Sequence, residues 1–158
     1  MQLYFLRHGQ AGKGSEWTGD DRLRPLTDEG RAAVVRAGVT LMRLELQVDV
    51  IVTSPLARAR QTADIAAEEL GLQEKVVDDE RLAHGFSRRA LAKILADHPK
   101  AQSVMLVGHE PEFSATIGEL TGGRVVCKKG SLARVDVDDP SVLRGQLVWL
   151  LPPRVLGL

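Results

Sequence analysis

Short apolar runs that stop at polar clusters dominate the hydrophobic pattern of the chain. The first covers residues 2–6, and runs rich in β-branched residues follow at 48–53 and 103–107, with a weaker one at 76–77. Runs of this length, bounded by polar or turn residues, are typical of buried strands. We therefore expect a set of short interior strands that each end at a polar turn.

Amphipathic stretches of helical period separate these runs. Thr27 is a plausible N-cap for a helix that reaches to about Leu46. Gly71 is expected to end the next helix, which starts near Leu56. The pattern predicts helices at residues 27–46, 56–70, 87–97 and 111–120. The segment 9–25, rich in glycine and charge, is expected to be a long loop.

Residues 130–137 and 145–151 alternate around an Asp-Asp-Pro turn, which predicts two late antiparallel strands. Strands alternating with helices favour an α/β fold, a three-layer α/β/α sandwich on a mostly parallel central sheet with this late antiparallel pair. A chain of 158 residues without a linker or repeat is expected to form a single domain over 1–158.

Charge and composition narrow the classes of partner. The 21 basic and 21 acidic residues balance, so no overall field attracts nucleic acid or a membrane surface. No segment has the ~20 apolar residues of a membrane span, the first apolar run is too short for a signal peptide, and Cys127 is the single cysteine. These features predict a cytoplasmic protein with no nucleic-acid or membrane partner, and they leave its oligomeric state open.

Three of the predicted strands end at clusters of histidine and arginine. Arg7 and His8 follow the first strand, Arg58 follows the second by one helical turn, and His109 follows the strand at 103–107. In open α/β sheets ligands bind beyond the carboxyl ends of the strands, so we expect these side chains to share one pocket.

Paired arginines and a histidine in one pocket indicate chemistry on an anion. Guanidinium groups match the geometry of phosphate oxygens. Their positive charge is expected to lower the pKa of His8 and to favour the neutral imidazole, which is the form that attacks phosphorus.

The motifs that carry these residues resemble the histidine phosphatase superfamily. The matching segments are Leu6-Arg7-His8-Gly9, the run at 54–63 from Ser54-Pro55 to Thr62-Ala63, and Val107-Gly108-His109-Glu110-Pro111. Further segments resemble the SixA-like phosphohistidine phosphatase branch: Arg24-Pro25-Leu26-Thr27, Lys128-Lys129-Gly130 and the ending at 149–154.

The resemblance implies a metal-independent phosphatase without a cofactor. His8 would be the nucleophile and form a phosphohistidine intermediate, while Arg7, Arg58 and His109 would bind the phosphoryl oxygens. The expected substrate is a phosphorylated protein bearing phosphohistidine. A phosphatase or mutase of a small phosphorylated metabolite is the first alternative, and a noncatalytic phosphate-binding module is the second.

The proton donor for the leaving group is not determined by the motifs. Glu80 and His84 lie near the position at which larger members of the resembled family share an acidic residue. Both are therefore retained as possible acid-base groups. Lys128 and Lys129 fit either a solvated turn or a role in steering an anionic substrate. No histidine or cysteine spacing fits a metal site.

Overall fold

The computed structural model describes residues 1–156 and contains one mixed six-stranded sheet. The strands lie in the order β3-β2-β4-β1-β5-β6, and β1 to β4 run parallel while β5 is antiparallel to both of its neighbours. The strands are β1 (Gln2–Arg7), β2 (Val50–Thr53), β3 (Val76–Asp78), β4 (Ser103–Gly108), β5 (Leu132–Asp139) and β6 (Arg144–Leu151). This sheet confirms the predicted mostly parallel arrangement with a late antiparallel pair.

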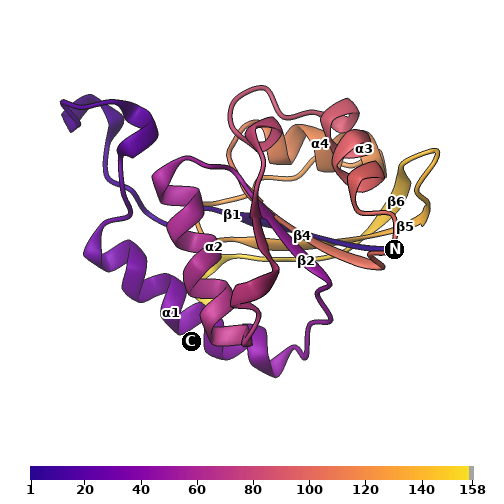
Figure 1. Cartoon of the computed structure of the whole chain (residues 1–158), viewed down its shortest axis with the longest axis horizontal. Helices are drawn as coiled ribbons and strands as arrows, with labels where there is room; N and C mark the ends of the chain where they lie inside the picture. Colours follow the sequence, from indigo (N-terminus) through magenta and orange to yellow (C-terminus); the bar gives the residue numbers. More distant parts are fainter. Residues whose placement is uncertain (157–158) are drawn as a thin grey trace.

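Helices cover both faces of the sheet, which completes the three layers (Figure 1). The helices are α1 (Asp28–Arg43), α2 (Ala57–Leu70), α3 (Arg88–Asp97), α4 (Glu112–Thr121) and the short α5 (Pro153–Leu156). Helices α1 and α2 lie on one face, with α5 packed on α1, and helices α3 and α4 lie on the other. None of the helices within residues 1–156 is both long and apolar enough to cross a bilayer.

The alternation of side chains along β1 explains why both faces are covered. Leu3 and Phe5 belong to the core beneath α3 and α4, whereas Tyr4 and Leu6 belong to the core beneath α1 and α2. Phe5 meets Phe113 of α4 edge to face, with ring centroids 5.3 Å apart. A strand that is apolar on both sides must lie in the interior of the sheet, and β1 lies between β4 and β5.

Local signals set most of the helix boundaries. The Thr27 hydroxyl accepts a hydrogen bond from the Gly30 amide at 3.0 Å and caps α1. Gly71 adopts φ 67° and ends α2, because a left-handed residue cannot continue the helix. Helix α1 stops at Arg43, three residues before the predicted end at Leu46.

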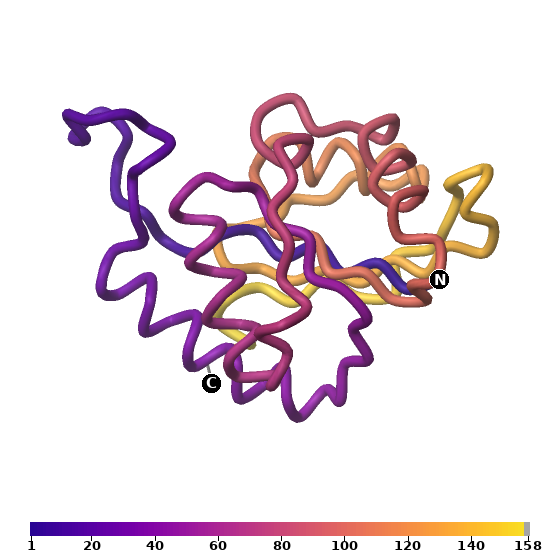
Figure 2. Tube along the Cα trace, in the orientation of Figure 1, coloured from indigo at the N-terminus to yellow at the C-terminus, as the bar shows by residue number. Residues whose placement is uncertain are grey.

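The loop between β1 and α1 extends away from the sheet and is the dark purple segment at the upper left of Figure 2. It contains two single turns of 3₁₀-helix, Gly14–Glu16 and Asp21–Leu23. Arg24 holds the loop together by donating to the carbonyl oxygens of Ala11 and Gly12 at 3.0 and 3.2 Å. The loop therefore has a defined shape beside the carboxyl ends of the parallel strands.

Candidate active site

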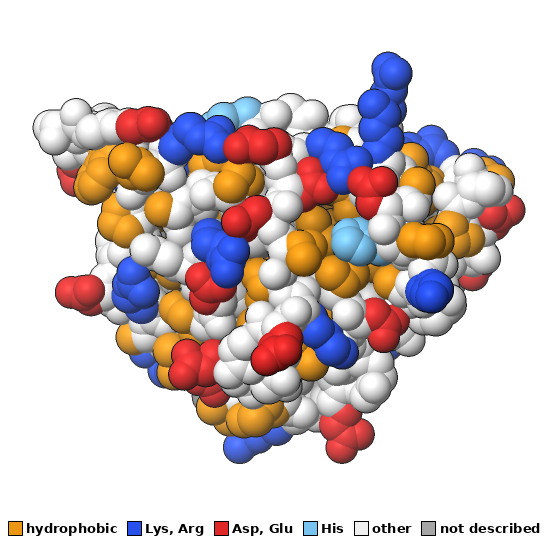
Figure 3. Space-filling model, viewed as in Figure 1, with side chains coloured by type: hydrophobic (Ala, Val, Ile, Leu, Met, Phe, Trp, Pro, Cys, Tyr) orange, Lys and Arg blue, Asp and Glu red, His pale blue; other side chains and the backbone are white. Residues whose placement is uncertain are grey.

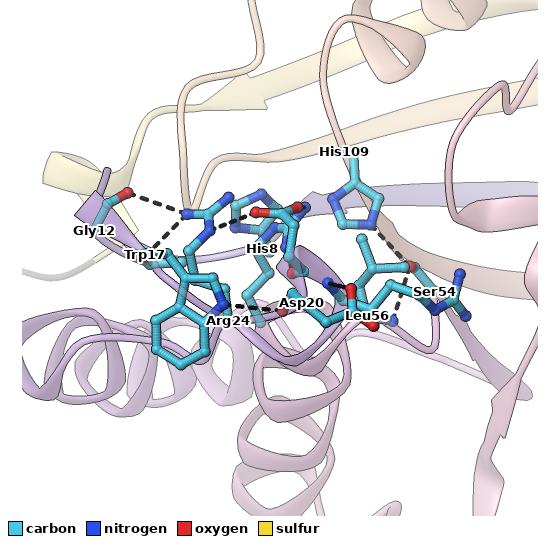
Figure 4. Close-up of polar contacts among 12 residues, drawn as sticks. His8, Gly12, Trp17, Asp20, Arg24, Ser54, Leu56 and His109 are labelled. Atoms are coloured by element: carbon cyan, nitrogen blue, oxygen red, sulfur yellow. Dashed lines mark hydrogen bonds and ion pairs between the residues drawn. The ribbon is translucent and has the colours of Figure 1, made fainter. Parts of the chain in front are cut away.

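The polar residues that end β1, β2 and β4 meet in one open cleft. The residues that line it come from the ends of β1 and β4, the β1–α1 loop, the first turn of α2, the segment after β3 and the turn before β5. Figure 4 shows His8, Gly12, Arg24 and His109 of this set. The lining residues are Arg7, His8, Gly12, Lys13, Gly14, Arg24, Arg58, His84, His109, Glu110 and Lys129. All four residues predicted to bind and transfer the phosphoryl group thus lie together, although they are up to 102 positions apart.

His8 is held in one tautomer by its own main chain. Its Nδ1 lies 2.7 Å from the carbonyl oxygen of Gly9, and a carbonyl can only accept a hydrogen bond. Nδ1 therefore carries the proton, and the lone pair of Nε2 is free. The His8 amide also donates to the Gly108 oxygen at 3.1 Å, which ties the residue to the end of β4.

The environment of His8 keeps its imidazole neutral. The pKa of His8 is lowered to about 3, with burial as the largest cause and the positive charges of Arg58, Arg7 and Lys129 acting in the same direction. The hydrogen bond to Gly9 acts in the opposite direction. The sequence predicted a lowered pKa from like charge alone, whereas in the structure desolvation contributes more.

His109 faces His8 across the cleft, with ring centroids 5.1 Å apart. Its Nε2 lies 2.8 Å from the Ser54 hydroxyl oxygen, which accepts a hydrogen bond from the Leu56 amide. The Ser54 hydroxyl can donate its proton to Nε2, which is the arrangement in which His109 carries its own proton on Nδ1. The pKa of His109 is lowered to about 3, chiefly by burial and also by the charge of Arg58, so a neutral imidazole is favoured over a cation.

Both arginines are fixed through one end of the guanidinium group. Arg7 Nη1 donates to the carbonyl oxygen of Cys127 at 2.8 Å. Arg58 Nη1 donates to the Asp21 carbonyl oxygen at 2.9 Å, and its Nη2 lies 3.1 Å from the Asp21 carboxylate. Arg60 instead pairs with Asp64 and Asp78 on the outer surface, as the helical spacing from Arg58 predicts.

Three buried side-chain nitrogen atoms of residues that line the cleft have no hydrogen-bond partner within residues 1–156. Among residues 1–156, the buried side-chain atoms that lack a hydrogen bond include Arg7 Nε, Arg58 Nε and His109 Nδ1. Buried donors are almost always paired in folded proteins, because an unpaired one costs about 1–3 kcal/mol. All three belong to residues predicted to hold phosphoryl oxygens.

The two possible acid-base residues have different positions. His84 lines the cleft, and its ring centroid lies 5.9 Å from that of His109. The Glu80 carboxylate does not line the cleft and instead pairs with Arg22 at 2.6 Å, with 70% of its side chain exposed. Of the two, the structure brings His84 next to the catalytic candidates.

Two further residues of the site were not identified as site residues from the sequence. Asp21 joins Arg58 to Arg24, because its carboxylate lies 3.1 Å from Arg58 Nη2 and 2.8 Å from Arg24 Nε. Ser54 orients His109. The sequence does not reveal such roles, because a serine or aspartate in a polar loop is common and its partner lies far along the chain. Lys129 lines the cleft, whereas the adjacent Lys128 is exposed and does not.

The charge of the cleft is local. The face in Figure 3 mixes basic and acidic side chains without a field of one sign, in keeping with the balanced composition. The cleft is lined by several cationic side chains and by one carboxylate, that of Glu110. This carboxylate already accepts hydrogen bonds from Ser114. The arrangement can bind an anion and present a neutral imidazole to it.

Sequence comparison identifies the class to which this cleft belongs. The family model of the histidine phosphatase superfamily (branch 1) matches residues 3–84. The chain belongs to this superfamily and is a histidine-nucleophile phosphatase.

Individual proteins match the chain over nearly its whole length. An uncharacterized protein of Picosynechococcus sp. is 35% identical over 169 residues, covering 96% of this chain and 100% of that protein. The fold matches the structure of the protein histidine phosphatase SixA complexed with tungstate, with a TM-score of 0.86, 23% identity and 98% coverage of both chains. It also matches a mycobacterial glucosyl-3-phosphoglycerate phosphatase, with a TM-score of 0.73, 22% identity, and coverage of 96% of this chain and 99% of that one.

Proposed function

We propose that this chain is a metal-independent phosphohistidine phosphatase that acts on phosphorylated proteins through a phosphohistidine intermediate on His8. The observation that carries the proposal is the set of three unpaired buried nitrogen atoms on Arg7, Arg58 and His109, residues that line one cleft together with a neutral His8. Such donors are oriented before the reaction, so they stabilise the charge of a transferring phosphoryl group at little reorganisation cost.

The first step follows from the tautomer of His8. The Nε2 lone pair attacks phosphorus, the new N–P bond forms, and the bond to the leaving group breaks with its electrons going to the leaving atom. The Nδ1–H group of His8 remains bonded to the Gly9 oxygen and so stabilises the imidazolium that develops. Water then attacks the phosphorus of the intermediate, which releases phosphate and restores the neutral imidazole.

Two features support a protein substrate. The cleft is an open depression, so a histidine on the surface of another protein can reach it. The leaving group of a phosphoramidate is an imidazole that solvent can protonate, which suits a site in which Glu80 is paired elsewhere.

The alternative with a specific observation in its favour is a phosphatase of a small phosphorylated metabolite. His84 lines the cleft beside His109 and would protonate the alkoxide that leaves from an ordinary phosphomonoester. The fold is shared with a glucosyl-3-phosphoglycerate phosphatase, which is consistent with such chemistry on this scaffold.

A substrate panel in the presence of a chelator tests the proposal. We expect turnover of a phosphohistidine protein to exceed that of small phosphomonoesters by orders of magnitude in kcat/KM, with no dependence on added metal. Faster turnover of the monoesters would favour the metabolite alternative, and His84→Ala should then reduce that turnover selectively.

Trapping of the intermediate distinguishes an enzyme from a noncatalytic phosphate-binding module. Acid-free quenching with labelled substrate should give a phosphoenzyme in the parent chain and none in His8→Ala. The matched control is His98→Ala, because His98 lies at the end of α3 and does not line the cleft. Tight binding of substrate without label transfer or phosphate release would reject the catalytic proposal.

A further inference from the structure

The cleft holds more positive charge than its internal partners neutralise. Its cationic lining residues are Arg7, Lys13, Arg24, Arg58 and Lys129. Arg24 and Arg58 share the Asp21 carboxylate, and Lys13 pairs with Glu16 at 3.2 Å. The charge of Glu110, the carboxylate among the lining residues, acts on Arg7, whereas Lys129 has no ion pair within residues 1–156.

The Lys129 ammonium is partly buried among other cations. Burial lowers its pKa, and the charges of Arg7, Arg24 and Arg58 lower it further, whereas no ion pair or hydrogen bond within residues 1–156 acts in the opposite direction. Cations placed close together in a partly desolvated cleft repel one another unless an anion lies between them. The phosphoryl group supplies one such anion.

The position of Lys129 relative to the nucleophile is fixed by the main chain. The amide of the next residue, Gly130, donates to the carbonyl oxygens of Arg7 and His8 at 3.1 and 3.0 Å. The Lys128 carbonyl oxygen in turn accepts from the Ser131 amide at 2.8 Å, which closes the turn. Lys129 therefore extends from a turn that is hydrogen-bonded to the catalytic segment itself.

The surroundings of the side chain favour an ammonium that reaches into the cleft. Lys129 also lines a second, more enclosed cavity whose other walls include the apolar side chains of Leu6, Val34 and Leu41. A lysine between an apolar and a polar space packs its methylene groups on the apolar side and keeps its charge on the polar side.

We propose that Lys129 forms a second anion-binding position beside the phosphoryl position, and that it favours substrates with a carboxylate close to the transferred phosphoryl group. This inference rests on the proposed function, because the second position acts on a substrate whose phosphoryl group is already bound. In a phosphohistidine protein the carboxylate belongs to an aspartate or glutamate beside the phosphohistidine.

Paired substrates and paired variants test this position. Two phosphohistidine peptides that differ only by Asp or Asn next to the phosphohistidine are compared as the ratio of their kcat/KM values. We expect a ratio of about three- to fivefold in the parent chain, the size of a partly exposed charge contact. The ratio should fall to about one in Lys129→Gln and stay unchanged in Lys128→Gln.

The ratio within each variant cancels any general loss of activity or folding, and thermal unfolding of both variants checks that they fold. An unchanged ratio in Lys129→Gln would overturn the proposal. An equal fall in both lysine variants would also overturn it, because that result indicates general electrostatic steering instead of a defined position.

A second substrate pair separates this inference from the proposed function. Phosphoglycolate carries a carboxylate beside its phosphoester, and ethyl phosphate does not. If the peptides are not hydrolysed, the phosphohistidine proposal fails, and the ratio for this pair in the two variants then tests Lys129 by the same criteria. If the peptides are hydrolysed and only the carboxylate preference is missing, the second anion position alone fails.

Discussion

The neutral state of His8 and His109 affects stability as well as chemistry. The pKa of each is lowered in the folded chain to about 3, from 6.5 for a free side chain. Between these two pH values the unfolded chain binds a proton at each histidine that the folded chain does not bind. The free energy of unfolding must therefore fall as the pH drops from about 6.5 towards about 3.

Substitution isolates this contribution from that of the carboxylates. Each histidine contributes up to about 1.4 kcal/mol per pH unit, so His8→Gln and His109→Gln should each give a shallower decline of unfolding free energy between pH 6 and pH 4.5. Urea denaturation at several pH values measures the slopes. Parallel slopes for the parent chain and both variants would contradict the neutral assignment.

The carboxylate of Asp21, in the β1–α1 loop, contacts both Arg24 and Arg58, so it is expected to orient Arg58. Asp21→Asn should lower kcat/KM about tenfold, because small displacements of a binding group reduce the rate strongly. Asp20→Asn is the matched control, since Asp20 only caps the 3₁₀ turn and asparagine caps equally well. Steady-state kinetics on one substrate measures both, and higher activity in Asp21→Asn would show that Asp21 competes with the substrate.

For single residues, the sequence predicted the site residues that belong to a recognisable motif. It missed the residues that act by positioning another side chain. Arg7, His8, Arg58 and His109 follow strands, and topology alone brings them together. Asp21 and Ser54 acquire their roles from contacts 37 and 55 positions away, which no local pattern contains. Glu80 and His84 are four positions apart in an irregular segment, so the sequence could not indicate which one faces the cleft.

At the scale of elements, close packing of α1 against the catalytic segment restricts Gly30. A Cβ at this position would overlap the carbonyl oxygen of Gln10, the residue after Gly9. Gly30→Ala should therefore destabilise the fold by about 1–3 kcal/mol, despite a gain of about 1 kcal/mol in helix propensity.

Glu29→Ala provides the comparison, because Glu29 is exposed in the same turn of α1. It should change the free energy of unfolding by no more than about 0.5 kcal/mol in urea titrations. If Gly30→Ala were as stable as Glu29→Ala, the contact between α1 and the loop would be looser than the structure shows.

The elements themselves were largely predictable, for identifiable reasons. A long amphipathic helix that follows a capping residue, such as α1 after Thr27, shows several turns of the helical period. A strand flanked by turn residues, such as β4, is marked at both ends, so the sequence identifies both kinds of element. Helix α5 was missed because four residues are too few to show a period. It is held by tertiary contacts, including the buried Leu156 and its carbonyl oxygen, which accepts from Thr40 at 2.7 Å.

At the scale of the whole molecule, formal charge is zero while the cleft is cationic. Electrostatic attraction of substrate should therefore be short-ranged. We expect kcat/KM to fall severalfold between about 0.01 M and about 1 M salt, over which the Debye length shrinks from about 30 Å to about 3 Å, while kcat changes less. Steady-state kinetics across this range measures it, and a flat profile would contradict a cationic cleft.

The place of β1 in the sheet has a consequence for synthesis on the ribosome. β1 leaves the exit tunnel well before its two neighbours, β4, which begins at Ser103, and β5, which begins at Leu132. The main-chain bonds of Arg7 and His8 to Gly108, Gly130 and Ser131 likewise wait for the last third of the chain. A nascent polypeptide that has not yet reached Ser131 thus already carries its reactive imidazole but not all the neighbours that orient it, so catalytic competence must wait until β5 is being made.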